Sequence, residues 1–211
     1  NLAKEPKLNT RTLDLKDCYW TNLMIHQLLV SDLIGSIGVV VHVGKYTTTT
    51  KEQGLKYMYE AIHYIIHQMK EMNIKSKLII ETPAGAGTEL LTDIDEFIQF
   101  YDMFTLDEKK CLGMCLDTAH IWSSGYDINE YYKYIAKTHA KEITVIHFNN
   151  SKKEQGSNAD AHDTIFEGKM PINDLEIFIT NVKQNKYKPL IILETPSDNH
   201  LEKEMEWVKN I

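Results

Sequence analysis

Short apolar runs alternate with amphipathic segments along most of this chain. Five runs are rich in valine, isoleucine or leucine and show little polar alternation: Ile37–Val41, Leu78–Ile80, Leu112–Leu116, Ile143–Ile146 and Leu190–Leu193. This pattern is typical of strands that are covered on both faces in a parallel sheet. We therefore predict five buried parallel strands.

Apolar residues between these runs recur at steps of three and four, which predicts helices with one apolar side. The clearest stripes are Leu55, Met58, Ile62, Ile65, Ile66 and Met69, then Ile94, Phe97, Ile98, Tyr101 and Phe104; weaker ones are Leu175, Phe178 and Val182, then Leu201, Met205 and Val208. A further helix is predicted over about Leu13–Leu33. Alternating strands and helices predict βαβ units, in a barrel or a doubly wound sheet.

Composition narrows the class of protein. With 211 residues and 43% hydrophobic residues, the chain can form one sizeable core, so we expect a single domain over residues 1–211. No apolar run reaches the roughly 18 to 20 residues of a membrane span, and no secretory leader is visible. Three cysteines without a C-x-x-C spacing predict reduced thiols in an intracellular protein. A formal net charge of −7 disfavours nucleic-acid binding through a broad basic face.

Every one of the five apolar runs ends in a side chain that can bind a metal. The residues at or after the run ends are His42, Glu81, Asp117, His147 and Glu194. In a parallel barrel, the carboxyl ends of all strands meet on one face, where active sites lie. Carboxylates gathered there without a cation would repel one another. The pattern therefore predicts a multi-metal site.

A second stretch adds ligands to this predicted site. Residues 156–168 read GSNADAHDTIFEG, in which Asp160 and His162 are two positions apart. In an extended backbone such residues project to the same side, so both can reach one ion. His120, three residues after Asp117, is a candidate third ligand. Histidine and carboxylate together suit zinc, with manganese or iron left open.

Several other residues have two interpretations. Lys152 and Lys153 follow His147 and either meet phosphates of a ligand or are solvated surface lysines. The pair His63 and His67 falls beside an apolar stripe and is expected to be exposed. For His26 we expect a structural or exposed position, and for Cys111 and Cys115 a shared core-facing side of one strand.

The segments VHVG, IETPAGAG, CLDTAHIWSSGYD, IHFNNSK, GSNADAHDTIFEG and ILETP occur in this order between about residues 37 and 196. Together they resemble the successive signature motifs of the endonuclease IV family of apurinic/apyrimidinic (AP) endonucleases. The longest of them, around Asp117–Asp127 and His147–Gly168, are highly specific. The resemblance implies a TIM-type (β/α)8 barrel that holds three zinc ions.

The resemblance also implies a ligand for each ion. His42 would bind the first zinc, and Glu81 would bridge the first two and position the attacking hydroxide. The second zinc would be completed by Asp117, His147 and Glu194, and the third would be held by His120, Asp160 and His162.

The N-terminus departs from the family pattern. Another histidine of the first zinc lies in a His-x-x-Tyr-x-x-Asn-Leu stretch, and this chain begins NLAKEP, which looks like its tail. The first two βα units would also be missing, with a loop that helps to penetrate DNA. A complete barrel typically has about 250 residues. We therefore expect a barrel that lacks its first two units, and a first zinc short of one ligand unless His26 replaces it.

The implied activity is hydrolysis of double-stranded DNA on the 5′ side of an abasic site, leaving a 3′-hydroxyl and a 5′-deoxyribose phosphate. Three divalent ions among four acidic ligands would give the site a charge of about +2, so that an acidic and monomeric protein could still bind a phosphodiester. Two alternatives stay open: a metal-dependent sugar isomerase or epimerase of similar barrel type, and a non-catalytic binder of abasic DNA. The pairs Asp117-x-x-His120 and Asp160-x-His162 favour the nuclease, because the sugar enzymes do not need a third site.

Overall fold

The computed structural model describes residues 15–16, 18–47, 49–195 and 198–211. Contacts between Cα atoms divide the chain into two compact units. The first unit runs to Glu81 and includes Gly87–Gly113, and the second comprises Thr82–Ala86 and Met114–Ile211. Within the described ranges, we find no helix whose length and hydropathy suit a membrane span.

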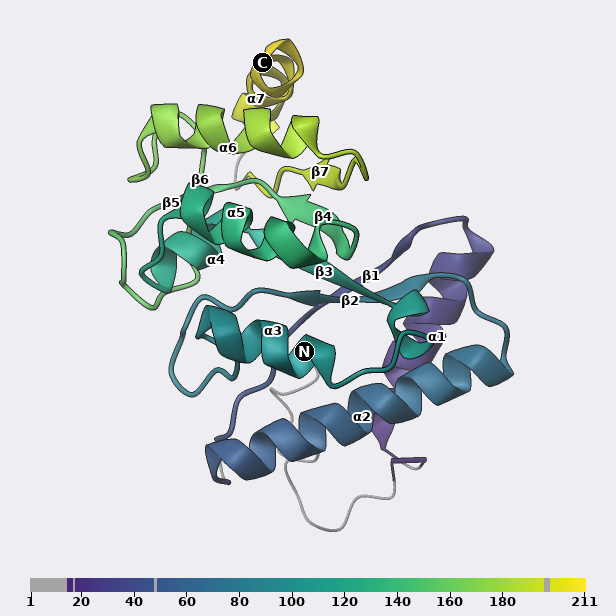
Figure 1. Ribbon diagram of the computed structural model, residues 1–211. Coiled ribbons are helices and arrows are strands. Elements are labelled where there is room, and N and C mark those ends of the chain that lie inside the picture. Colours follow the sequence, from purple (N-terminus) through teal and green to yellow (C-terminus); the bar gives the residue numbers. More distant parts are fainter. Residues whose placement is uncertain (1–14, 17, 48, 196–197) are drawn as a thin grey trace. The chain divides into compact units, whose positions relative to one another are not determined.

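The described part of the first unit contains two parallel strands and three α-helices. Its elements are α1 (Tyr19–Leu33), β1 (Gly38–His42), α2 (Lys51–Glu71), β2 (Lys77–Glu81), α3 (Ile94–Asp102) and the short 3-10 helix η1 (Glu108–Lys110). Strands β1 and β2 pair in register from Gly38 opposite Lys77 to His42 opposite Glu81, and α1 packs against α2 (Figure 1). The shared register places the last residues of both strands side by side.

Two helices of the first unit, α2 and α3, begin at residues whose side chains cap them. Thr50 accepts a hydrogen bond from the backbone N–H of Gln53 at the start of α2, and Asp93 accepts two from the start of α3. Such caps satisfy amide groups that have no partner inside the helix. The predicted apolar stripe of α2 is buried from Met58 to Met69. Capping and burial together account for this long helix.

Besides Thr82–Ala86, the second unit comprises most of strand β3 (Leu112–Asp117) and the elements that follow it. These are α4 (Thr118–Ser123), α5 (Ile128–His139), β4 (Ile143–His147), β5 (Asn150–Ser151), β6 (His162–Asp163), α6 (Ile172–Gln184), β7 (Leu190–Ile192) and α7 (Asp198–Asn210). Strand β4 pairs in parallel with β3 and with β7, and β5 pairs with β6 in an antiparallel ladder. Helices α5 and α6 lie against each other (Figure 1). The carboxyl ends of β3, β4 and β7 therefore point the same way.

All five predicted strands are confirmed, within one residue at each end. Strand β3 is buried throughout, and β4 is buried except at Thr144. Strands β1 and β7 are exceptions to the predicted burial. In β1 only Val41 is buried, and in β7 Leu190 and Ile192 are exposed. Among the described residues, β7 pairs only with β4, so its other edge is uncovered.

Several predictions about the helices and the cysteines need correction. The first helix begins at Tyr19 rather than near Leu13, which lies outside the described residues. Helix α5 was missed, since its buried side includes tyrosines and polar residues. In α7, Met205 is exposed, although it was assigned to the apolar stripe. Cys111 precedes β3 and is only partly buried, whereas Cys115 is fully buried within the strand.

Asn150 fastens the long segment between β5 and α6. Its side-chain amide N–H groups donate to the carbonyls of Ile165 and Met170, and its carbonyl oxygen accepts from the amides of Ser151 and Met170. Gly168 lies directly against this side chain. A Cβ atom at position 168 would come within 2.3 Å of Asn150 Oδ1. The segment that contains Asp160 and His162 therefore requires glycine at this point.

We expect Gly168→Ala to lower the free energy of unfolding by about 1–3 kcal/mol, the usual cost of forcing extra atoms into a packed region. Urea unfolding followed by circular dichroism measures this change. Glu167→Ala, at the exposed neighbouring position, is the matched control and should have little effect. Equal stability of Gly168→Ala and the parent chain would contradict the close packing described above.

Candidate metal centre

Asp117 is the residue around which the site in the second unit is built. It ends β3, it caps α4 by accepting the backbone N–H of His120 at 2.9 Å through Oδ1, and it is completely buried. Its own N–H donates to the hydroxyl of Thr82 at 3.0 Å. Two hydrogen bonds thus fix Asp117, one at its backbone N–H and one at Oδ1, and the second carboxylate oxygen, Oδ2, remains for other partners.

One ligand group comprises Asp117, His120 and His162, whose ligand atoms lie within 4.8 Å of one another. Asp160 joins this group, because its Oδ1 lies 3.3 Å from His120 Nε2 and 3.5 Å from His162 Nε2. The prediction that Asp160 and His162 lie together is therefore confirmed. In addition, His162 Nε2 lies 3.5 Å from Asp117 Oδ2. Four side chains from two segments, 117–120 and 160–162, meet here.

The hydrogen bonds of His120 decide which ring nitrogen faces this group. Nδ1 lies 2.8 Å from the carbonyl oxygen of Thr82, which can only accept, so Nδ1 carries the proton. In the neutral ring, Nε2 then has a lone pair that faces the carboxylate of Asp160. A lone pair beside a carboxylate is unfavourable unless a proton or a cation lies between them. Histidines that bind a metal through one ring nitrogen commonly donate the N–H of the other to a backbone carbonyl, as His120 does here.

The other ligand group uses the same aspartate. Asp117, His147 and Glu194 offer ligand atoms that lie within 4.8 Å of one another. Nδ1 of His147 is 3.1 Å from Oε2 of Glu194 and 3.8 Å from Oδ2 of Asp117. The hydrogen bond with His147 lowers the pKa of the Glu194 carboxyl below its ordinary value, which keeps this carboxylate ionised. Asp117 is therefore common to both groups.

Asn149 orients the two carboxylates of this second group. Its amide N–H2 donates to Asp117 Oδ2 at 2.9 Å and to Glu194 Oε2 at 3.3 Å, and its carbonyl oxygen accepts the backbone N–H of Glu194 at 2.8 Å. The side chain is almost completely buried. Sequence reasoning missed this residue, and the only available signal was its place two positions after His147 in the segment IHFNNSK.

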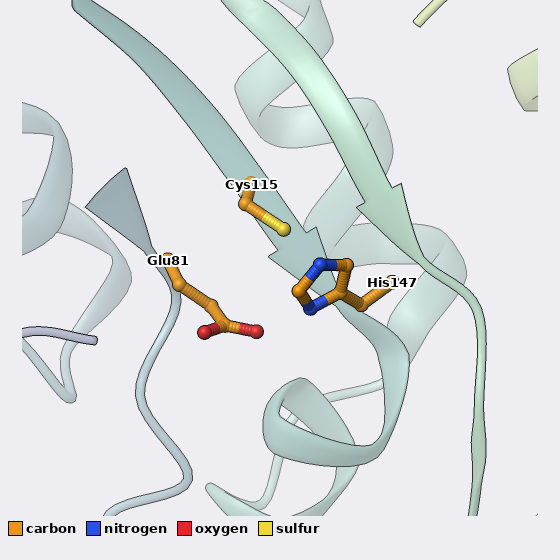
Figure 2. Close-up of side chains that lie close together, drawn as sticks. All are labelled: Glu81, Cys115 and His147. Atoms are coloured by element: carbon orange, nitrogen blue, oxygen red, sulfur yellow. The ribbon is translucent and has the colours of Figure 1, made fainter. Parts of the chain in front are cut away.

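Cys115 lies two residues before Asp117 on β3. Its sulfur and a ring nitrogen of His147, on the neighbouring strand β4, are within 4.8 Å of each other, and Figure 2 shows the thiol directed toward the imidazole. The thiol is completely buried. Its core position, predicted from the sequence, is confirmed, and the structure adds that it borders a candidate ligand.

The first unit holds its own ligand pair at its paired strand ends. His42 ends β1 and Glu81 ends β2, and their side chains lie 3.1 Å apart, from Nε2 to Oε2. Glu81 is 2% exposed, whereas the His42 side chain is 46% exposed. His26, His63 and His67 are all exposed, and none of them belongs to a candidate metal-ligand group found among the described residues.

The side chains of the second unit fit a divalent cation. The ring nitrogen Nε2 of His162 is buried and makes no hydrogen bond to the described residues, although carboxylate oxygens lie 3.5 Å away. An ion between these groups would satisfy the nitrogen and neutralise the carboxylates. Mixed histidine and carboxylate ligands are those that zinc prefers, and manganese also accepts them.

Comparison with known proteins gives the family. A relative named "Probable endonuclease 4", from Mycoplasma pneumoniae, is 30% identical over 190 residues, which cover 88% of this chain and 64% of the relative. The chain thus spans less than two thirds of that protein. A solved endonuclease IV from Thermus thermophilus superposes with a TM-score of 0.70 at 22% identity, covering 90% of this chain and 68% of that one.

A D-tagatose 3-epimerase-like protein superposes equally well, with a TM-score of 0.73 at 15% identity, covering 95% of this chain and 73% of that one. These likenesses to solved structures show the fold. A sequence model described as "Xylose isomerase-like TIM barrel" matches residues 22–211. The chain therefore belongs to the xylose isomerase-like TIM barrel family.

Proposed function

We propose that this chain is the metal-binding part of an AP endonuclease, which hydrolyses duplex DNA on the 5′ side of an abasic site and leaves a 3′-hydroxyl and a 5′-deoxyribose phosphate. The observation that carries the proposal is the pair of ligand groups that share Asp117. The names of the curated relatives support the same activity. The prediction that two βα units are missing from a single barrel domain stays a prediction.

The proposed ligand sets follow the two groups. Asp117, His147 and Glu194 hold one zinc ion, and His120, Asp160 and His162 hold another. His42 and Glu81 are proposed as ligands of a further ion, as the family resemblance implies. Bound ions of this kind supply an activated water as nucleophile and stabilise negative charge on the phosphate and the leaving oxygen.

The protein's own residues prepare this chemistry by fixing orientation. Thr82 holds the tautomer of His120, and Asn149 holds the carboxylates of Asp117 and Glu194. Because these partners are buried, the ligand atoms keep their positions without help from solvent. No histidine or carboxylate of the two groups is proposed to form a covalent bond with DNA.

A metal-dependent sugar epimerase is the second candidate, because an epimerase-like structure shares the fold. The fold alone does not separate the two activities. The group of His120, Asp160 and His162 separates them, since a sugar enzyme needs no ions beyond those at the strand ends. A non-catalytic binder of abasic DNA would keep the same ligands but would not cut.

We expect the purified chain to contain zinc by elemental analysis and to nick a duplex that carries a tetrahydrofuran abasic analogue, on the 5′ side of the lesion. Removing the metal with a chelator should abolish nicking.

His162→Ala should lose about one zinc and reduce the nicking rate by about 100-fold or more, because an ion that stabilises the transition state is lost. His67→Ala, at an exposed histidine of α2, is the control.

Three results would contradict the nuclease. Binding of abasic duplex without cutting by the zinc-loaded chain would favour the non-catalytic binder. Epimerisation of a ketose without nicking would favour the sugar enzyme. Full zinc content in His162→Ala would show that the group of His120, Asp160 and His162 does not hold an ion.

Lys152 and Lys153 are proposed to contact DNA phosphates beside the metal centre. The backbone N–H of Lys152 donates to the carbonyl of Ala161, which lies between Asp160 and His162, and the indole N–H of Trp122 donates to the carbonyl of Lys153. Both lysine side chains are exposed. Their backbone is thus fixed next to the proposed ligands while their charges face solvent.

We expect the double variant Lys152→Ala/Lys153→Ala to bind DNA with a weaker salt dependence. Each lost phosphate contact should reduce the slope of log affinity against log salt by about 0.9. Fluorescence anisotropy with a nicked duplex that carries the abasic analogue avoids turnover during the titration. Lys137→Ala, at an exposed position on α5, is the matched control, and an unchanged slope in the double variant would place the lysines away from DNA.

A further inference from the structure

Glu204 is a completely buried carboxylate on helix α7. Its acidic neighbours on the same helix, Glu202 and Glu206, are both exposed. Taking a carboxylate out of water is costly unless hydrogen bonds compensate for the lost hydration. We therefore expect hydrogen bonds within the second unit to stabilise the buried Glu204 carboxylate.

The partners of Glu204 lie beside two proposed metal ligands. Oε1 accepts the backbone N–H of Ile165 at 2.7 Å, and Oε2 accepts the hydroxyl of Thr195. Ile165 is three residues after His162, and Thr195 immediately follows Glu194. One carboxylate thus ties the segment that contains His162 to the end of β7.

Trp207 extends the same helix face to a third ligand. Its ring stacks with Phe148, which immediately follows His147, at a centroid distance of 6.4 Å and an interplanar angle of 8°. It also meets the edge of Phe166 at 5.7 Å. Helix α7 therefore contacts the chain within four residues of His147, His162 and Glu194, although none of its described side chains belongs to a candidate ligand group.

We propose that Glu204 is a positioning residue for the metal centre, which sets the mutual placement of His162 and Glu194 and thereby the affinity for zinc. This inference rests on the proposed function, because it requires those two side chains to be ligands. Hydrogen-bonded partners of ligands typically change metal affinity by about 10- to 100-fold. Glu204 acts one step farther out, through Thr195 and the backbone at Ile165.

The test compares three variants of the full chain by zinc affinity, measured in competition with a chromophoric chelator at pH 7. Glu204→Ala removes both hydrogen bonds and should weaken zinc binding by about 10-fold or more. Glu204→Gln keeps an acceptor for Ile165 and offers an N–H2 to the Thr195 oxygen, so it should restore most of the affinity. Glu206→Ala, at the exposed position, should match the parent chain.

Cobalt substitution provides a second measurement that does not depend on activity. We expect the visible absorption of the cobalt-loaded chain to change in Glu204→Ala and to stay close to that of the parent in Glu204→Gln. Thermal melting of each metal-free variant reports the effect on folding separately. If Glu204→Ala fails to fold, Thr195→Val removes one of the two hydrogen bonds with little change in volume and should still weaken zinc binding.

A lower melting temperature of Glu204→Ala with unchanged zinc affinity and cobalt spectrum would overturn the inference, since Glu204 would then only stabilise the fold. An unchanged affinity in Thr195→Val would do so where Glu204→Ala cannot be purified. Failure of the ligand assignment looks different, because the parent chain itself would then bind no zinc. Failure of the nuclease activity alone would appear as zinc binding by the parent chain without nicking of abasic duplex.

Discussion

The site depends on the mutual repulsion of carboxylates that the fold brings to one place. Asp117 and Glu194 offer oxygens within 4.8 Å of each other, and the Asn149 amide donates to both. Two like charges about 4 Å apart, at an effective dielectric constant of about 20, repel by about 4 kcal/mol. A neutral amide offsets only part of this energy. A divalent cation removes the repulsion and turns the same arrangement into a binding site.

This repulsion also links metal binding to stability. A cation that binds only the folded chain stabilises it by an amount that grows with the logarithm of its concentration over its dissociation constant. The second unit is the part most affected, because the two groups that share Asp117 both lie within it. The parallel pairing of β4 with β3 and β7 is what brings these ligands to the same edge.

The sequence was sufficient to predict the strands and the proposed ligands. Parallel strands buried on both faces read as continuous apolar runs, so β3 and β4 were visible directly. The polar residue that ends each run stands out against that background, as Asp117 and His147 do. Asp160 and His162 were found by their spacing alone, and the structure brings both to His120.

The residues that orient the ligands were not predictable in the same way. Asn149 and Glu204 are ordinary polar residues whose roles depend on partners distant in sequence, 45 and 39 residues away in the bonds to Glu194 and Ile165. In α7, the apolar stripe read from the sequence included Met205, whereas the structure buries Glu204 and exposes Met205. A hydrophobic pattern assigns carboxylates to the solvent side, so it fails where a buried carboxylate receives hydrogen bonds from the chain.

The buried polar residues that the hydrophobic pattern missed hold the proposed ligands in place. Had solvent-facing side chains or the ions alone oriented the ligands, the metal-free site would rearrange to separate its carboxylates. Burial of Asn149 and Glu204 ties the supporting hydrogen bonds to folding itself, so folding brings the ligand atoms close together. Such preorganisation gives up some stability of the metal-free chain in exchange for tighter metal binding. Preorganisation also gives the gathered carboxylates of this net negative chain a purpose. A cation bound among them makes the site attractive to an approaching phosphate.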